Sequence, residues 1–204
     1  MKCFERIILH QLMKHTKQHL DPYQFAYKHN RSTEDATLAL LRNAYTHLEK
    51  PGSFVRILFT DFSSVFNTIQ PHLMASKLLR LAVNPRLILW IVEFLVSSSQ
   101  TVRHQAALSS SRSISTCSPQ GTVLSPILFT LYTNDCTDTD TTSVIKYSDG
   151  SAKEDLFNSD SVYFAEVERF SNWCRGNSLD LNVKKTKEIL TDFRKAPAVI
   201  PGLY

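Results

Sequence analysis

Glycine, paired cysteines and long apolar runs are all scarce in this sequence. Only 5 of the 204 residues are glycine, which argues against collagen-like, repetitive or linker-rich chains. The four cysteines (Cys3, Cys117, Cys136 and Cys174) are widely scattered and form no CxxC pair. Neither a zinc site nor a disulfide framework is therefore indicated, and unpaired cysteines fit a reducing compartment.

No stretch of the chain has the length and apolarity of a membrane span. The longest apolar run, residues 87–96, is short and is interrupted by Glu93. The first 15 residues carry too much charge for a signal peptide. We therefore expect a cytoplasmic or nuclear protein with no membrane partner. The sequence leaves the oligomeric state open.

The overall composition is that of a globular chain with a sizeable core. Hydrophobic residues make up 43% of the sequence and charged residues 21%. A length of 204 residues is enough for one large domain or two small ones. The net charge of +4 is compatible with a polyanionic partner but is too small to require one.

The most informative stretch is an apolar run that ends in one carboxylate. Residues 54–59 are almost wholly apolar and are followed closely by Asp61. A run of this length, rich in β-branched and aromatic residues, predicts a buried strand. A carboxylate at the exit of such a strand needs a hydrogen-bond donor, a cation or a metal. The simpler alternative is that Asp61 caps the turn or short helix that follows.

A second carboxylate follows another predicted strand. Residues 144–147 form a short apolar run, and Ser148-Asp149-Gly150 has the composition of a turn. If the two strands are neighbours in one sheet, Asp61 and Asp149 meet at one edge. Shared carboxylates there could hold two Mg²⁺ ions about 3.5–4 Å apart and support phosphoryl transfer. Pairs of strand-end acids are common, so the pair alone does not decide the function.

Spacing and turn signals predict the remaining elements. Helices are expected over residues 2–20, 32–47, 73–81, 84–96, 122–135 and 162–174. Strands are expected over residues 100–107 and 113–117, as a hairpin with a serine-rich turn, and over 179–183 and 189–193.

Five segments resemble a known family in both order and spacing. They are LDPYQFAYKHNRSTEDATL, FTDFSSVFNTIQPHLM, SPQGTVLSPILFTLYTND, KYSDG and WCRGNSLDLNVKKTKEILTDFR. Together they resemble the reverse transcriptases of non-LTR (LINE-type, jockey-like) retrotransposons over residues 2–194. The resemblance implies an α+β fold, the right-hand palm of a polymerase, in which helices pack on one face of an antiparallel sheet. It further implies partial helical fingers over residues 1–53, a palm over 54–195, a frayed tail over 196–204 and no thumb.

The resemblance assigns roles to the two acids and to two aromatic residues. Asp61 and Asp149 would be metal-binding carboxylates of the palm, with the carbonyl of Phe62 as a backbone ligand. Phe66 would be the aromatic steric gate under the sugar of the incoming nucleotide. Without the resemblance, Phe66 is an ordinary core aromatic.

Further residues are implied to contact nucleotide or template. Gln120 and Gly121 belong to the turn beside the nucleotide, where glycine allows close approach of the backbone. The alternative for Gly121 is a plain helix-entry turn. Lys185 and Lys187 correspond to the basic loop near the triphosphate, and their alternative is a solvated turn between strands.

The implied activity is that of an RNA-directed DNA polymerase. It would catalyse two-metal nucleotidyl transfer with Mg²⁺, using an RNA template, a DNA primer and a deoxynucleoside triphosphate. Without a thumb, little would hold the primer–template duplex, so affinity should be modest and strongly salt-dependent.

One position departs from the family pattern. The active-site turn of the family reads Tyr-Ala-Asp-Asp, whereas this chain has Tyr147-Ser148-Asp149-Gly150. Glycine deletes one of three carboxylates and weakens binding of the catalytic ion. Misplacing reacting groups by about 1 Å can cost on the order of a hundredfold in rate. We therefore expect a severely impaired polymerase. The alternatives are a non-catalytic RNA-binding relic and a non-functional remnant of an element.

Overall fold

The computed structural model describes residues 2–28, 30–63, 68–96, 98–105, 107–114, 121–139, 142–148, 150–155 and 159–194. The chain divides into two compact units. The first comprises Met1–Leu20 and Ser64–Thr133, and the second comprises Asp21–Ser63 and Asn134–Tyr204. These units do not follow the expected boundary at residue 53, and the assignment of fingers and palm remains a prediction.

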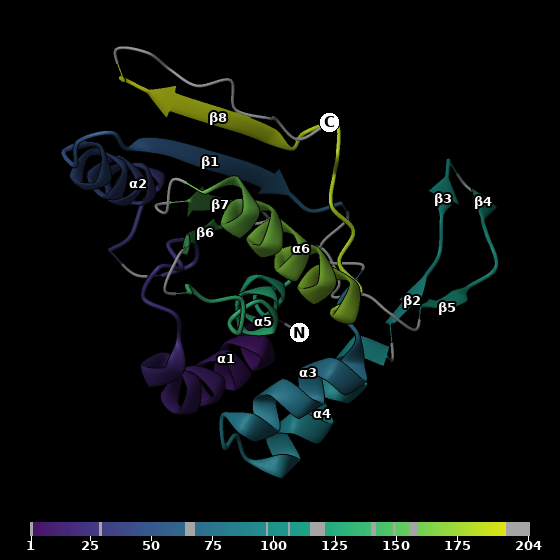
Figure 1. The fold of residues 1–204 in the computed structure, drawn as a ribbon. Coiled ribbons are helices and arrows are strands. Elements are labelled where there is room, and N and C mark those ends of the chain that lie inside the picture. Colours follow the sequence, from purple (N-terminus) through teal and green to yellow (C-terminus); the bar gives the residue numbers. More distant parts are fainter. Residues whose placement is uncertain are drawn as a thin grey trace. The chain divides into compact units, whose positions relative to one another are not determined.

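The second unit is built on a four-stranded antiparallel sheet (Figure 1). Its elements are α2 (Thr33–Leu48), β1 (Phe54–Asp61), β6 (Thr142–Tyr147), β7 (Gly150–Asp155), α6 (Asp160–Gly176) and β8 (Lys187–Asp192). The strand order is β6-β7-β1-β8. Because β1 and β6 both pair antiparallel with β7, they run in the same direction and end at the same edge. The two strands that precede Asp61 and Asp149 are therefore not direct neighbours, since β7 lies between them.

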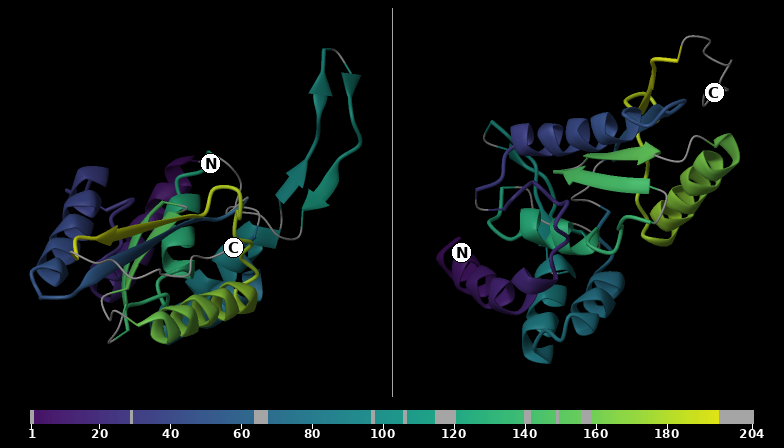
Figure 2. Two further views of the ribbon diagram at one scale, coloured as in Figure 1. Left: turned by 45° about the horizontal axis from the view of Figure 1, so that its top comes forward. Right: turned by 60° about the vertical axis from the view of Figure 1, so that its left-hand side comes forward.

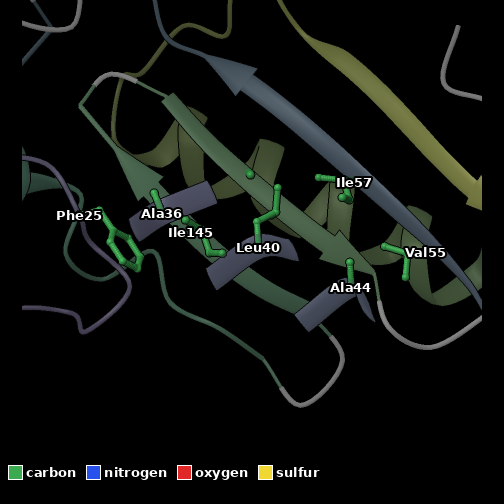
Figure 3. Close-up of a cluster of buried hydrophobic side chains, with 8 residues drawn as sticks. Phe25, Ala36, Leu40, Ala44, Val55, Ile57 and Ile145 are labelled. Atoms are coloured by element: carbon green, nitrogen blue, oxygen red, sulfur yellow. The ribbon is translucent and has the colours of Figure 1, made fainter. Parts of the chain in front are cut away.

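Helix α2 covers one face of this sheet. Its apolar positions Ala36, Leu40 and Ala44 pack against Val55 and Ile57 of β1 (Figure 3). The helix begins as the sequence predicts. The Ser32 side chain accepts a hydrogen bond from the backbone of Asp35, and the Asp35 carboxylate accepts one from Ser32 N. This capping box satisfies N-terminal donors that the helix itself cannot.

Helix α6 covers the opposite face (Figure 2). Successive strand residues point to opposite faces, so Arg56 lies on the face that Val55 and Ile57 leave free. The Arg56 guanidinium pairs with Asp160 at 2.7 Å and lies over the Tyr163 ring at 4.4 Å. The expected α+β sheet is present. The expectation of helices on one face was incomplete, because both faces are covered.

Strand β7 was not expected from its sequence, GSAKED, which has no apolar alternation. Its polar side chains are nevertheless buried between the two helices. The Lys153 ammonium lies 4.1 Å from the centroid of the Phe170 ring, and Glu154 accepts a hydrogen bond of 3.0 Å from Asn43 Nδ2. Partners on both helices therefore stabilise a strand that local propensity does not favour.

The chain before α2 extends this sheet at its β6 edge. Phe25 N donates to Lys146 O and Lys146 N donates to Tyr23 O, both at 2.9 Å. The Lys146 ammonium forms a buried ion pair of 2.6 Å with Asp21 and also donates to the Cys136 carbonyl. These contacts hold residues 21–25 beside the strand that leads to the Tyr147-Ser148 turn.

The first unit is mainly helical. Its elements are α1 (Lys2–Thr16), η1 (Lys17–His19), α3 (Pro71–Arg80), α4 (Pro85–Val96), β2 (Ser98–Gln100), β3 (Arg103–His104), β4 (Ala107–Leu108), β5 (Arg112–Ile114) and α5 (Ser125–Tyr132). Helix α4 begins as predicted, with Asn84 Oδ1 accepting from Arg86 N and proline at the first position. The buried carboxylate of Glu5 in α1 accepts a hydrogen bond of 2.7 Å from Val123 N, which holds the segment just before α5 against α1.

The predicted hairpin is present, but its turn was misplaced. β2 pairs with β5 and β3 pairs with β4, which makes one two-stranded ribbon that extends from the helices of this unit (Figures 1 and 2). The register of the β3–β4 pair puts the turn between His104 and Ala107. The serine-rich residues 109–111 lie along the ribbon instead, where Ser109 N donates to Val102 O.

The end of the second unit differs from the expected pair of strands. Residues 187–192 form β8, where a strand was expected over 189–193, but residues 179–183 contribute only a single bridge, Phe62 to Leu181. The proposed tail lies outside the described residues. Within the described part of the chain, no helix is long and apolar enough to cross a membrane.

Candidate active site

Asp61 is the last residue of β1 and lies directly opposite Gly150 of β7. Directly opposite residues of antiparallel strands present their side chains on the same face, with Cβ atoms about 4.5–5.5 Å apart. A side chain at position 150 would therefore stand beside that of Asp61. A Cβ atom there would meet the Thr60 carbonyl oxygen at 3.2 Å and the Tyr147 carbonyl oxygen at 3.7 Å. Glycine thus leaves no side chain beside Asp61, and any larger residue would press on the Thr60 carbonyl oxygen.

Lys185 supplies the charge partner of Asp61. Its Nζ lies 3.0 Å from Asp61 Oδ2. The Asp61 side chain is 22% exposed, and its Oδ2 is fully buried and accepts no hydrogen bond from the described residues. The contact at 3.0 Å is therefore a charge–charge contact with poor hydrogen-bond alignment. This pairing agrees with the sequence argument that a carboxylate at the end of a buried strand needs a cation.

The other expected residues of the second unit lie at different depths. The Phe62 side chain is buried and its ring centroid lies 6.3 Å from that of Phe170. Phe62 forms a bridge with Leu181, and the hydrogen bonds on either side of this bridge are made by Asp61 O and Ser63 N. The Phe62 carbonyl itself therefore points away from the segment that contains Leu181. Lys187 is exposed at the start of β8, opposite Phe59, and its ammonium is not the one that reaches Asp61.

The remaining expected residues lie in the other unit or outside the described residues. Gly121 belongs to the first unit, where its φ of +77° lies in the left-handed region that glycine favours. It precedes α5, as the helix-entry alternative requires. Asp149, Phe66 and Gln120 lie outside the described residues.

Tyr27 contacts the turn at Ser148, which the sequence argument did not predict. Its hydroxyl lies 2.9 Å from Ser148 Oγ, and both residues have positive φ angles, 57° for Tyr27 and 54° for Ser148. Tyr27 thus braces the turn that follows β6. The only signal in the sequence was an aromatic residue in the irregular stretch before α2, which does not identify a partner.

A small apolar cavity lies beside this turn, between α2 and the sheet. Its volume is about 220 Å³, and its lining includes Thr33 and Ala36 of α2, Phe59 of β1, Tyr147 and Gly150. Gly150 therefore borders this cavity.

These residues fit a pair of divalent cations poorly as they stand. The Asp61 carboxylate is the hard oxygen donor that Mg²⁺ prefers. However, the Lys185 ammonium lies 3.0 Å from one of its oxygens, and Gly150 contributes no carboxylate beside it. Among the described residues, no three His, Cys, Asp or Glu side chains gather in a metal-binding arrangement.

Comparison with known proteins identifies the family. Residues 1–198 match the family model described as reverse transcriptase (RNA-dependent DNA polymerase). The chain belongs to the reverse transcriptase family. No curated protein matches the chain by sequence.

Solved structures support the same fold for this reverse transcriptase chain. Telomerase from Candida tropicalis, in complex with a TWJ fragment of telomeric RNA, matches at a TM-score of 0.68 and 12% identity. That match covers 91% of this chain and 33% of the other. The corresponding Candida albicans complex matches at a TM-score of 0.64 and 14% identity, covering 91% and 35%. The chain spans about a third of the length of these proteins. The expected α+β palm is thereby confirmed as a fold.

Proposed function

We propose that this chain is the palm and partial fingers of a non-LTR retrotransposon reverse transcriptase in which nucleotidyl transfer is severely impaired. The observation that carries the proposal is the pairing of Asp61 with Gly150 across two neighbouring strands. An aspartate in place of Gly150 would put another carboxylate on the same face as Asp61. Glycine removes that charge from the position where a divalent cation would need it.

The substrates of the intact activity would be an RNA template, a DNA primer and a deoxynucleoside triphosphate. Divalent cations, when bound, would clamp the attacking and leaving oxygens of the transfer. The chain's own contribution would be Asp61 at the end of a rigid strand and Tyr27 bracing the adjacent turn. Residues 1–53 are proposed as partial fingers and 54–195 as palm.

Primer extension with variants at position 150 tests the proposal. Gly150→Asp should raise Mg²⁺- or Mn²⁺-dependent extension on the order of a hundredfold over the natural chain. Gly150→Asn is the matched control, because it places a side chain of the same size against Thr60 O without adding charge. Both variants should share any loss of stability from that close contact, so a difference in rate between them reports the charge.

Two results would count against the proposal. Template-dependent synthesis by the natural chain at the rate of Gly150→Asp would show that the missing carboxylate does not matter. Folded Gly150→Asp with no extension would show that the loss of activity lies elsewhere.

A second candidate is an RNA-binding module without catalysis. It is favoured by the pairing of Asp61 with Lys185 and by the lack of a carboxylate at Gly150. A relic of this kind would bind RNA whether or not metal is present.

A further inference from the structure

We propose that Lys185 is the resident cation of Asp61 and lowers the affinity of this carboxylate for divalent cations. The inference rests on the proposed function, because it concerns the metal-binding carboxylate of that site. It goes further, because it names a residue of this chain that competes with the metal. The competition would add to the loss of the acid at position 150.

The first support is the depth of the carboxylate oxygen. Asp61 Oδ2 is fully buried, whereas the Lys185 side chain that reaches it is 67% exposed. A buried carboxylate oxygen without a hydrogen bond is costly, so it requires a nearby cation. Lys185 meets that requirement from the solvent side, which is also the side from which a dissolved ion must approach.

The second support is the way the backbone holds Lys185. Asn182 N donates to the carbonyl oxygen of Asp61 itself at 2.8 Å. Asn182 O then accepts from Lys185 N at 3.0 Å and from Thr186 N at 2.9 Å. The turn that carries Lys185 is thus fastened to the residue whose carboxylate it neutralises. The ammonium is therefore kept at a high local concentration around Asp61, unlike a lysine on an unattached loop.

The third support is the balance of charge. Asp61 and Lys185 together are neutral, and Gly150 contributes no charge to the opposite strand. A divalent ion at Asp61 would meet an ammonium within a few ångströms, so it must displace that group. The Lys185 side chain is 67% exposed, so solvent weakens the pair. Displacement is therefore possible, and the expected effect is limited to about fivefold in affinity.

Mn²⁺ binding to the full chain, without nucleotide or RNA, tests the inference. Free Mn²⁺ can be followed by electron paramagnetic resonance during titration. Lys185→Gln should raise the Mn²⁺ association constant about fivefold, whereas Lys185→Arg, which keeps the charge, should not. Lys184→Gln is the matched control, because Lys184 is an exposed residue of the same turn and the substitution removes the same charge. It should change the association constant less than about twofold.

The gain must also depend on Asp61. In an Asp61→Asn background, Lys185→Gln should give no increase. An equal gain from Lys184→Gln and Lys185→Gln would show a general charge effect and overturn the inference. No detectable binding by folded Lys185→Gln, at concentrations where Gly150→Asp binds, would overturn it as well.

The outcome is separable from that of primer extension. A gain in Mn²⁺ affinity with an inactive Gly150→Asp chain would support competition by Lys185 and count against the polymerase. Primer extension by Gly150→Asp, with unchanged Mn²⁺ affinity in Lys185→Gln, would support the polymerase and count against competition by Lys185.

Discussion

At the scale of one residue, the buried acid Glu154 has an unusual environment. It is 0% exposed, on the α2 face of β7. Its Oε2 accepts a hydrogen bond from Asn43, while Oε1 has no hydrogen-bond partner among the described residues. Burial, opposed by the bond from Asn43 and reinforced by the charge of Asp138, raises the pKa of Glu154 to about 7. The folded protein therefore binds a proton here that the unfolded chain releases near pH 4.5.

That shift predicts a pH dependence of stability. Because the pKa of Glu154 is higher in the folded state, its contribution favours folding at low pH and is lost as pH rises from about 4.5 to about 7. Glu154→Gln mimics the protonated acid, so its stabilising effect should be on the order of 2 kcal/mol larger at about pH 8 than at about pH 5. Urea unfolding at both pH values measures this.

Glu168→Gln on the exposed surface of α6 provides the control, since it removes the same charge without touching the interior. Equal effects of Glu154→Gln at the two pH values would contradict the assignment.

At the scale of elements, β7 and its neighbour β6 each carry a buried lysine, and the two lysines differ in whether the ammonium has a polar partner. Lys153 of β7 is 3% exposed, and its ammonium has no hydrogen-bond partner among the described residues. Burial lowers the pKa of Lys153. Lys146 of β6 is equally buried but pairs with Asp21 and donates to Cys136 O.

Substitution of these two lysines should have opposite effects. Lys153→Met keeps the volume and removes a buried charge, so it should be neutral or raise the unfolding free energy by about 1 kcal/mol. Lys146→Met leaves Asp21 buried without its partner and should lower the unfolding free energy by about 3 kcal/mol. Denaturant unfolding of both variants against the natural chain measures the contrast, and equal destabilisation would refute it.

At the scale of the whole molecule, the net charge of +4 suits weak binding of a polyanion. Binding to single-stranded RNA should weaken roughly twentyfold between about 50 and about 200 mM KCl, if about three phosphates are neutralised. Fluorescence anisotropy of a labelled RNA measures this dependence.

The same measurement separates the two proposed functions. Equal RNA affinity in EDTA and in Mg²⁺ would favour the non-catalytic module, since the Asp61 carboxylate already has Lys185 as its partner. Binding of nucleotide and Mg²⁺ together would favour the polymerase.

Local chemistry explains what could be predicted from the sequence. The capping box at Ser32 and the cap at Asn84 need only residues within the same turn, and both are present. The hairpin turn was misplaced because the ladder register, rather than the serine content of residues 109–111, decides where the ribbon turns. β7 was missed because its polar side chains are stabilised by Asn43 of α2 and Phe170 of α6, which no local pattern reveals.

The sequence by itself determined that an apolar strand ends in Asp61 and that the segment order is that of a reverse transcriptase. That Gly150 replaces an aspartate of the family's turn stays a prediction. Only the tertiary structure decided that Gly150 lies across from Asp61 and that Lys185, rather than Lys187, neutralises it. These partners are distant in the chain, so their pairing depends on strand register and on the hydrogen bonds of the turn at Asn182.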